Sequence, residues 1–398
     1  MKININKIFN RFVVVASAIT LLTSCNKDVE TAVPITRSDP AGQSIADVIN
    51  TDPTFTILKA AVAKAGTSLS TLLADRTGVF TFFAPTDAAF QASGIPSVAA
   101  LAAFRAGQLD TILRYNLVGG QVLTGAILPS TFPNLQAPSL FALQAPSASL
   151  PPGLRMSLFP SKRGTNYWVN NIPLTQTDIQ VANGVIHKTA ALVIPPSQFL
   201  WDRINTDANL TYLKAAIQRA DSGVAATSSL QAALSNPAAN LTVFAPTNLA
   251  FQQLLTGQIT QALIAQGVPA ATASAQATAL ASTPAVFTNP ALSAVLTPLS
   301  IQGLVVYHIL GVRAFTVNLP TTATAVPTLL NGGIPTHPGV TVQATFGPTG
   351  VTAATVKGLV NSTASNLLIN PTPAPGGTSD QLYINGVLHV IDQVLRPQ

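Results

Sequence analysis

Charged side chains are scarce in this chain of 398 residues, of which only 9% are Asp, Glu, Lys or Arg. Globular proteins usually carry about 25%, so this composition excludes a disordered polyelectrolyte. Three of the basic residues, Lys2, Lys7 and Arg11, lie in the first eleven positions, and removing them lowers the net charge from +6 to +3. Binding to nucleic acid depends on clustered phosphate-neutralising cations, which are missing here, and we expect no nucleic-acid partner.

Cysteine is nearly absent, since Cys25 is the only one. The rest of the chain therefore has no disulfide and no thiolate metal site. The four histidines, at positions 187, 308, 337 and 389, show no ligand spacing. Motifs for hydrolases, zinc proteases and phosphate-binding loops are also missing. We predict no metal and no cofactor.

Long hydrophobic runs are missing beyond an apolar stretch of eleven residues at positions 12–22. This stretch is too short to span a bilayer, which takes about 20 residues, and it follows a basic N-terminus as in a signal peptide. The next residues, Leu22-Thr23-Ser24-Cys25, resemble a bacterial lipoprotein box. We expect a signal peptide at 1–24, a lipid on Cys25 and a tether at 25–43. The alternative is an ordinary secretory signal with an incidental cysteine.

The chain contains an internal repeat. Residues 80–90 (FTFFAPTDAAF) recur as residues 241–251 (LTVFAPTNLAF), and 183–187 (NGVIH) recur as 385–389 (NGVLH). A third block, Ile-Asn-Thr-Asp, lies before the first of these blocks in each copy, at 49–52 and again at 204–207. Three blocks in the same order twice indicate a duplication.

Each repeated block predicts a local structure. Residues 80–83 read as a strand stopped by Ala84-Pro85, after which Thr86 is a good N-cap for a helix, and Thr247 is its counterpart. The Asn-Gly pairs predict tight turns, each followed by an alternating strand that contains His187 or His389.

The Ala-Pro-Thr block (80–90 and 241–251) and the Asn-Gly-x-x-His block (183–187 and 385–389) closely resemble the two most characteristic segments of the fasciclin domain. The resemblance implies an α+β fold of two tandem modules, each a twisted β-sandwich or wedge with packed helices. We place the first module at 44–197 and the second at 198–398. The second carries a long Ala/Thr-rich insertion at about 256–298, in which residues 259–264 read as helical and the prolines break the rest.

The candidate catalytic residues have simpler structural interpretations. His187 and His389 need a nucleophile and an orienting carboxylate to act as bases, and we find no such set kept in both copies. We predict that they are buried and satisfy backbone groups. Asp87 is replaced by Asn248 in the second copy, which argues against a catalytic carboxylate. We expect no enzymatic activity.

The resemblance implies a role in adhesion. Tyr307-His308 matches the tyrosine-histidine segment associated with integrin adhesion in animal fasciclin proteins, although we favour packing of the helix as its role. We expect a lipid-anchored protein of the bacterial outer membrane, on its surface or its periplasmic face, that binds an extracellular or periplasmic protein or glycan. The alternative is glycan capture for polysaccharide uptake or degradation, with Trp168 or Trp201 stacking on sugar rings.

Overall fold

The computed structural model describes residues 41–127, 134–144, 153–348, 350–373 and 376–398. Residues 41–398 form one compact unit. The predicted signal peptide, Cys25 and most of the tether lie outside the described residues. Among those that are described, no helix is both long enough and apolar enough to cross a membrane.

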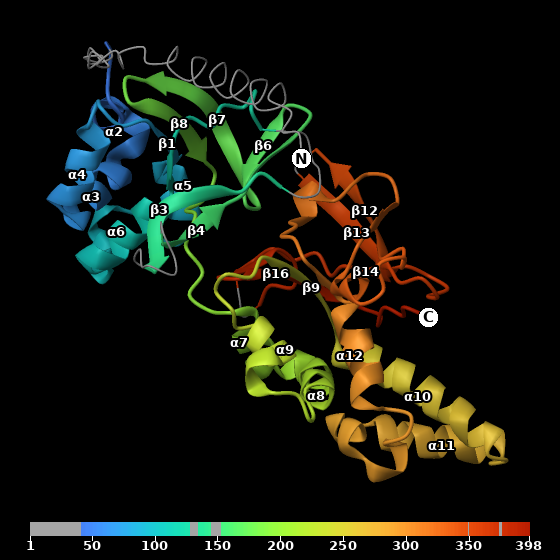
Figure 1. The fold of residues 1–398 in the computed structure, drawn as a ribbon. Coiled ribbons are helices and arrows are strands. Elements are labelled where there is room, and N and C mark those ends of the chain that lie inside the picture. Colours follow the sequence, from blue (N-terminus) through green and yellow to red (C-terminus); the bar gives the residue numbers. More distant parts are fainter. Residues whose placement is uncertain (1–40, 128–133, 145–152, 349, 374–375) are drawn as a thin grey trace, which may run out of the picture. The chain divides into compact units, whose positions relative to one another are not determined.

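The first module begins with helices and continues into a sheet (Figure 1). Its helices are α2 (Ile45–Thr51), α3 (Thr56–Ala65), α4 (Thr67–Ala74), α5 (Asp87–Ala92) and α6 (Ala106–Tyr115). Its strands are β1 (Phe80–Pro85), β2 (Leu117–Gly119), β3 (Ala137–Gln144), β4 (Leu154–Leu158), β5 (Pro160–Arg163), β6 (Asn166–Val169), β7 (Ile172–Val181) and β8 (Gly184–Thr189). They form one sheet in the order β4-β3-β2-β1-β8-β7-β6-β5.

The second module repeats this order of elements with two smaller sheets, β10-β9-β16-β15 and β11-β12-β13-β14. Its helices are α7 (Leu200–Thr206), α8 (Thr211–Ala220), α9 (Leu230–Ala233), α10 (Asn248–Ala265), α11 (Ala270–Ala281) and α12 (Pro298–Val306). Its strands are β9 (Leu241–Pro246), β10 (Ile309–Leu310), β11 (Thr324–Val326), β12 (Val340–Gly347), β13 (Gly350–Lys357), β14 (Ser365–Asn366), β15 (Gln381–Tyr383) and β16 (Gly386–Ile391). The predicted α+β fold with tandem modules is confirmed.

The two repeated blocks pair with each other in the centre of each module. Strand β1 runs parallel to β8 with Phe80 opposite Gly184, and β9 runs parallel to β16 with Leu241 opposite Gly386. The register is the same in both modules. Strand β1 continues through Pro85, two residues further than predicted, because its pairing with β2 ends at Phe82 and the missing N–H of the proline faces no partner there.

The central strands separate two apolar cores in each module. Successive side chains of a strand point to opposite faces of the sheet. Phe82 of β1 accordingly packs into the core under the helices, and Phe83 packs into a second core on the other face. In β9, Val243 likewise packs into the core under the helices, and Phe244 packs into the core on the other face. The module is therefore built around a strand pair that is buried on both faces.

The insertion of the second module is more helical than predicted. Helix α10 runs through Ala265, and α11 forms a second helix beside it (Figure 1). Ala273, Ala277 and Ala281 of α11 are buried at a spacing of four residues, so one face of small side chains packs closely. Alanines give little periodic hydrophobic contrast, and for this reason the sequence pattern missed the helix.

Candidate functional site

The repeated histidines are buried and both ring nitrogens are committed to the backbone. His187 accepts a hydrogen bond at Nδ1 from Asp178 N (3.2 Å), and its Nε2 lies 2.7 Å from Val122 O. His389 has the same arrangement with Asp380 N (3.2 Å) and Ala314 O (2.9 Å). Because a carbonyl oxygen only accepts, Nε2 carries the proton and each ring is neutral. Burial lowers the pKa of His187, which favours this neutral form.

Each histidine has an aspartate partner that the sequence analysis missed. Asp178 and Asp380 precede the histidines by nine residues and adopt left-handed backbone conformations, with φ of 56° and 53°. The carboxylate of Asp178 accepts hydrogen bonds from the amide and hydroxyl of Thr124. The carboxylate of Asp380 accepts the same pair from Thr316, each at 2.6 Å. The sequence contains a signal for them, because an aspartate lies nine residues before the histidine in both copies.

This His–Asp–Thr set resembles a catalytic triad in composition but not in geometry. An aspartate does lie beside both histidines, but its carboxylate does not orient the imidazole ring. In a triad the carboxylate accepts from the imidazole, whereas here the backbone amide of the aspartate donates to it. The rings of His187 and His389 have no exposed surface. The set therefore has a structural role. Its hydrogen bonds hold the loop after β2 against the β7–β8 hairpin in the first module, and the loop after β10 against the β15–β16 hairpin in the second.

The Ala-Pro-Thr segments cap two helices at once. The hydroxyl of Thr86 accepts from Ala89 N at the start of α5, and that of Thr247 accepts from Ala250 N at the start of α10. The next residue caps a different helix: Asp87 accepts from Ile57 N (2.7 Å), at the start of α3. Asn248 uses its Oδ1 in the same way on α8. Both a carboxylate and an amide can cap this helix, because each supplies an acceptor oxygen. The second polar atom differs: Asp87 Oδ2 accepts from Thr56 N (3.2 Å), whereas Asn248 Nδ2 donates to Ala208 O (2.8 Å).

The asparagines of the Asn-Gly pairs fasten the first helix of each module. Asn183 accepts from Ile45 N (2.8 Å) and donates to Leu73 O (2.9 Å), and it is fully buried. Asn385 makes the equivalent contacts in the second module. Gly184 follows with φ of 141°, and a Cβ there would lie 1.8 Å from Phe80 O. Only glycine permits this approach of β8 to β1.

Tyr307 and His308 are both buried. The hydroxyl of Tyr307 donates to Gly339 O (2.6 Å) and accepts from Leu359 N (2.9 Å). His308 lies 2.8 Å from Leu304 O at Nδ1 and accepts from Leu395 N at Nε2 (2.9 Å). Neither side chain is exposed to a partner, and both hold α12 against the sheet.

An apolar groove lies beside this pair, between α12 and the short helix Leu329–Gly332. We call it the α12 groove; its volume is about 710 Å³. Leu299 and Ile334 on its rim are 77% and 47% exposed. None of the described residues that line it is Asp, Glu, Lys or Arg. His337 lines the groove and packs edge-on against Tyr307 at 5.1 Å, so the buried tyrosine supports the groove from behind.

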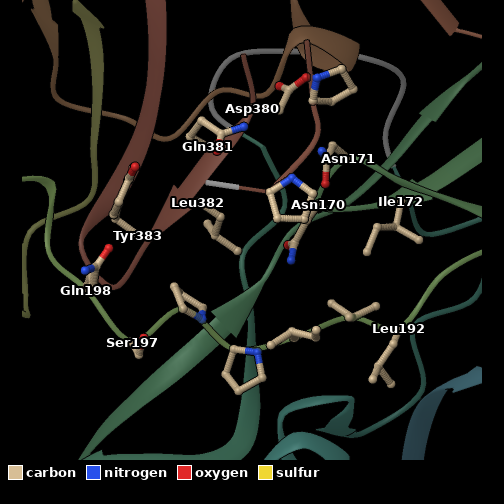
Figure 2. Close-up of a pocket in the computed structure, with 16 residues that line it drawn as sticks. Asn170, Asn171, Ile172, Leu192, Ser197, Gln198, Asp380, Gln381, Leu382 and Tyr383 are labelled. Carbon is tan, nitrogen blue, oxygen red and sulfur yellow. The ribbon is translucent and has the colours of Figure 1, made fainter. Parts of the chain in front are cut away.

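A second pocket of about 420 Å³ lies between β15 and the segment that joins the two modules, which we call the joint and which runs from the end of β8 to the start of α7 (Figure 2). The joint, with Leu192 and Ser197, lines one side, and Asp380 and Gln381 lie on the other. The carboxylate of Asp380 is committed to Thr316, and no Lys or Arg is among the described lining residues. The described lining therefore offers no positively charged side chain to an anionic ligand.

Of the two tryptophans considered for sugar stacking, Trp168 is buried and Trp201 is partly buried. Trp168 is 5% exposed and lies in an apolar cluster with Phe159, Phe315, Val317 and Val387. Trp201 packs against the helical core of the second module. Among the described residues, no group of three or more His, Cys, Asp or Glu is placed to hold a metal ion.

Comparisons with known proteins agree with this architecture. The model of the fasciclin domain matches residues 53–195 and 222–397. Transforming growth factor-beta-induced protein ig-h3 from Sus scrofa is 30% identical over 158 residues, which are 40% of this chain and 20% of that protein. The chain thus spans about a fifth of the length of that relative.

Among solved structures, the FAS1 domain pair from the insect cell adhesion molecule Fasciclin I covers 88% of this chain and 95% of its own. The TM-score is 0.34 and the identity is 12%. The family model covers most of the chain in two separate stretches, each built around the same parallel strand pair. The chain therefore belongs to the fasciclin family and is a tandem fasciclin-domain protein.

Proposed function

We propose that this chain is a non-enzymatic adhesion protein, held at a bacterial outer membrane by a lipid on Cys25. Fasciclin domains are associated with cell adhesion, and both modules of this chain match the family. A match of both modules is the observation on which the proposal chiefly depends. The buried, backbone-bonded histidines support the non-enzymatic part, because a base must reach its substrate.

The α12 groove is the contact surface in this proposal. Exposed apolar side chains that surround a groove are typical of binding sites for proteins. None of the described residues that line the groove has an Asp, Glu, Lys or Arg side chain, so we expect its contacts to be mainly apolar packing and hydrogen bonds. We therefore expect that attachment falls only weakly as the salt concentration rises. A steep fall between low and high ionic strength would contradict this mechanism.

Attachment of cells that display the full chain tests the surface. Surfaces coated with extracellular-matrix proteins or with polysaccharide are offered to cells that carry wild type or the double variant Leu299→Asp, Ile334→Asp. Burying one such side chain contributes about 1.5–3 kcal/mol, and 1.4 kcal/mol is tenfold in affinity, so we expect at least about a tenfold loss. Leu249→Asp is the matched control, since Leu249 is 60% exposed on α10 and lies away from the groove. Equal attachment of cells carrying any of the three proteins would refute the proposal that the α12 groove is the contact surface.

Fractionation tests the anchor. We expect Cys25→Ser to abolish palmitate labelling and to move the protein from the membrane fraction to the soluble fraction. Ser24→Ala is the control, because it keeps a small residue before the cysteine. Membrane retention of the unlabelled variant Cys25→Ser would refute lipid anchoring.

A further inference from the structure

The structure contains a buried cation without a counter-charge. Arg313, in the loop between β10 and the short helix Thr316–Asn318, is only 5% exposed. In the described part of the chain it forms no ion pair with a carboxylate. One of its terminal nitrogens donates to Ile384 O (3.1 Å), and the guanidinium lies 4.7 Å from the ring centre of Phe159. Its Nε–H is buried and has no partner.

Such a group is costly. Removing a guanidinium from water costs several kcal/mol unless other charges or hydrogen bonds replace the water. One carbonyl and one aromatic face satisfy few of the five N–H donors. Burial lowers the pKa of Arg313 to about 10, so the side chain still carries its charge at neutral pH. Among the described residues, the positive charge of Arg313 therefore has no negative charge beside it to compensate for the loss of water.

Arg313 lines a small polar cavity of about 60 Å³. Gln136, Arg155 and Ser157 of the first module lie on one side, and Asn240 and Arg313 of the second module lie on the other. The cavity thus has two arginines, and none of its described lining residues is acidic. A water needs about 10–15 Å³ of such space, so the cavity has room for a small ion.

The neutral side chains add hydrogen-bond donors. The hydroxyl oxygen of Ser157 accepts from Gln136 Nε2 (3.0 Å), which leaves its own proton available. The amide oxygen of Asn240 is buried without a partner. Turning this amide by 180° exchanges its oxygen and nitrogen and places an N–H donor there instead. Ser157, Asn240 and Arg313 can then all donate into the cavity.

We propose that the cavity at Arg313 is a binding site for a small monovalent anion of chloride size, which bridges the two modules. The anion accepts from Arg313 Nε and from the neutral donors, and it supplies the missing counter-charge. Because residues of both modules face the cavity, the anion stabilises the contact between them. Its removal leaves the arginine uncompensated at that contact.

Thermal unfolding of the full mature chain tests the site with chloride as the probe. Chloride replaces gluconate, which is too large for the cavity, at a constant total of 200 mM sodium salt. For wild type we expect a saturating increase in Tm of about 2–4 °C. We expect Arg313→Gln to lose this increase. The matched control is Arg219→Gln, since Arg219 donates to Leu296 O away from the cavity and should leave the increase unchanged.

A second measurement covers the case in which Arg313→Gln fails to fold. In wild-type crystals soaked with bromide we expect an anomalous peak within about 3.5 Å of Arg313 Nε, the range of a hydrogen bond to a large anion. Ser157→Ala should raise the chloride concentration at half effect. Water alone in the cavity, no effect of chloride on wild type, or an equal effect on Arg313→Gln would overturn the proposal.

Discussion

We predict that His308 makes the second module sensitive to mild acid. The ring is 1% exposed, and it donates from Nδ1 to Leu304 O while Nε2 accepts from Leu395 N. Protonation would put a hydrogen on Nε2, facing the N–H of Leu395, and would place a charge in the core. Burial accordingly lowers the pKa of His308 to about 4.

The direction of the effect follows from linkage. Histidine in the unfolded chain has a pKa of about 6.5, so the unfolded state binds more protons between pH 6.5 and 4. The stabilisation is complete above pH 6.5 and is lost as the pH falls toward 4. A shift from about 6.5 to about 4 corresponds to roughly 3 kcal/mol of unfolding free energy.

The first module supplies the variant that tests this. Asn116 follows α6 as His308 follows α12, and its Nδ2 donates to Ile112 O (2.7 Å), four residues earlier. His308→Asn can keep the corresponding bond to Leu304 O but cannot titrate. It leaves Leu395 N without its acceptor, so we expect a loss of about 1–3 kcal/mol at pH 7. Between pH 7 and 4, however, wild type should lose roughly 3 kcal/mol more than the variant.

Urea unfolding from pH 7.5 to 4 at constant ionic strength measures both curves. Acidic groups and the other histidines are common to the two proteins, so the difference between the curves isolates position 308. An NMR titration of the ring gives the pKa directly. Parallel curves, or a measured pKa near 6.5, would refute the reasoning.

Three further changes test the repeated elements. His389→Ala removes the partners of Asp380 N and Ala314 O, and we expect a loss of about 2–5 kcal/mol in urea unfolding; lost attachment at an unchanged midpoint would instead indicate a binding role. Gly184→Ala should cost about 3 kcal/mol or more, whereas Gly66→Ala, at a similar φ with open space around it, should cost only about 1–2 kcal/mol; equal losses would contradict the close approach of β8 to β1. Asp87→Asn should change the stability by less than about 1 kcal/mol, because the second copy caps its helix with an amide; a loss as large as that of Asp87→Ala would show that the charge matters.

The sequence predicted the features that depend on neighbouring residues. The strand, the N-cap at Thr86 and the helix follow one another within eleven positions, and their recurrence at Thr247 indicated the duplication. The turns before His187 and His389 were equally local. These signals come from backbone preferences and capping, which depend on a few adjacent side chains.

What the sequence could not predict depends on residues far apart in the chain. The face on which α11 packs, and the aspartate amide and carbonyl that hold each histidine, became visible only in the folded chain. The burial of Arg313 next to Phe159 is of the same kind, since the two residues lie in different modules.

The amino-acid order by itself thus determined the doubled module and the local capping of the helices, and the α+β class followed from the resemblance of the repeated blocks to the fasciclin domain. The tertiary structure alone decided which polar groups lie in the core, which of them have partners, and where an apolar surface stays uncovered. The physical reason is that burial and hydrogen-bond satisfaction are properties of packing in space, whereas capping and turn formation are properties of short segments.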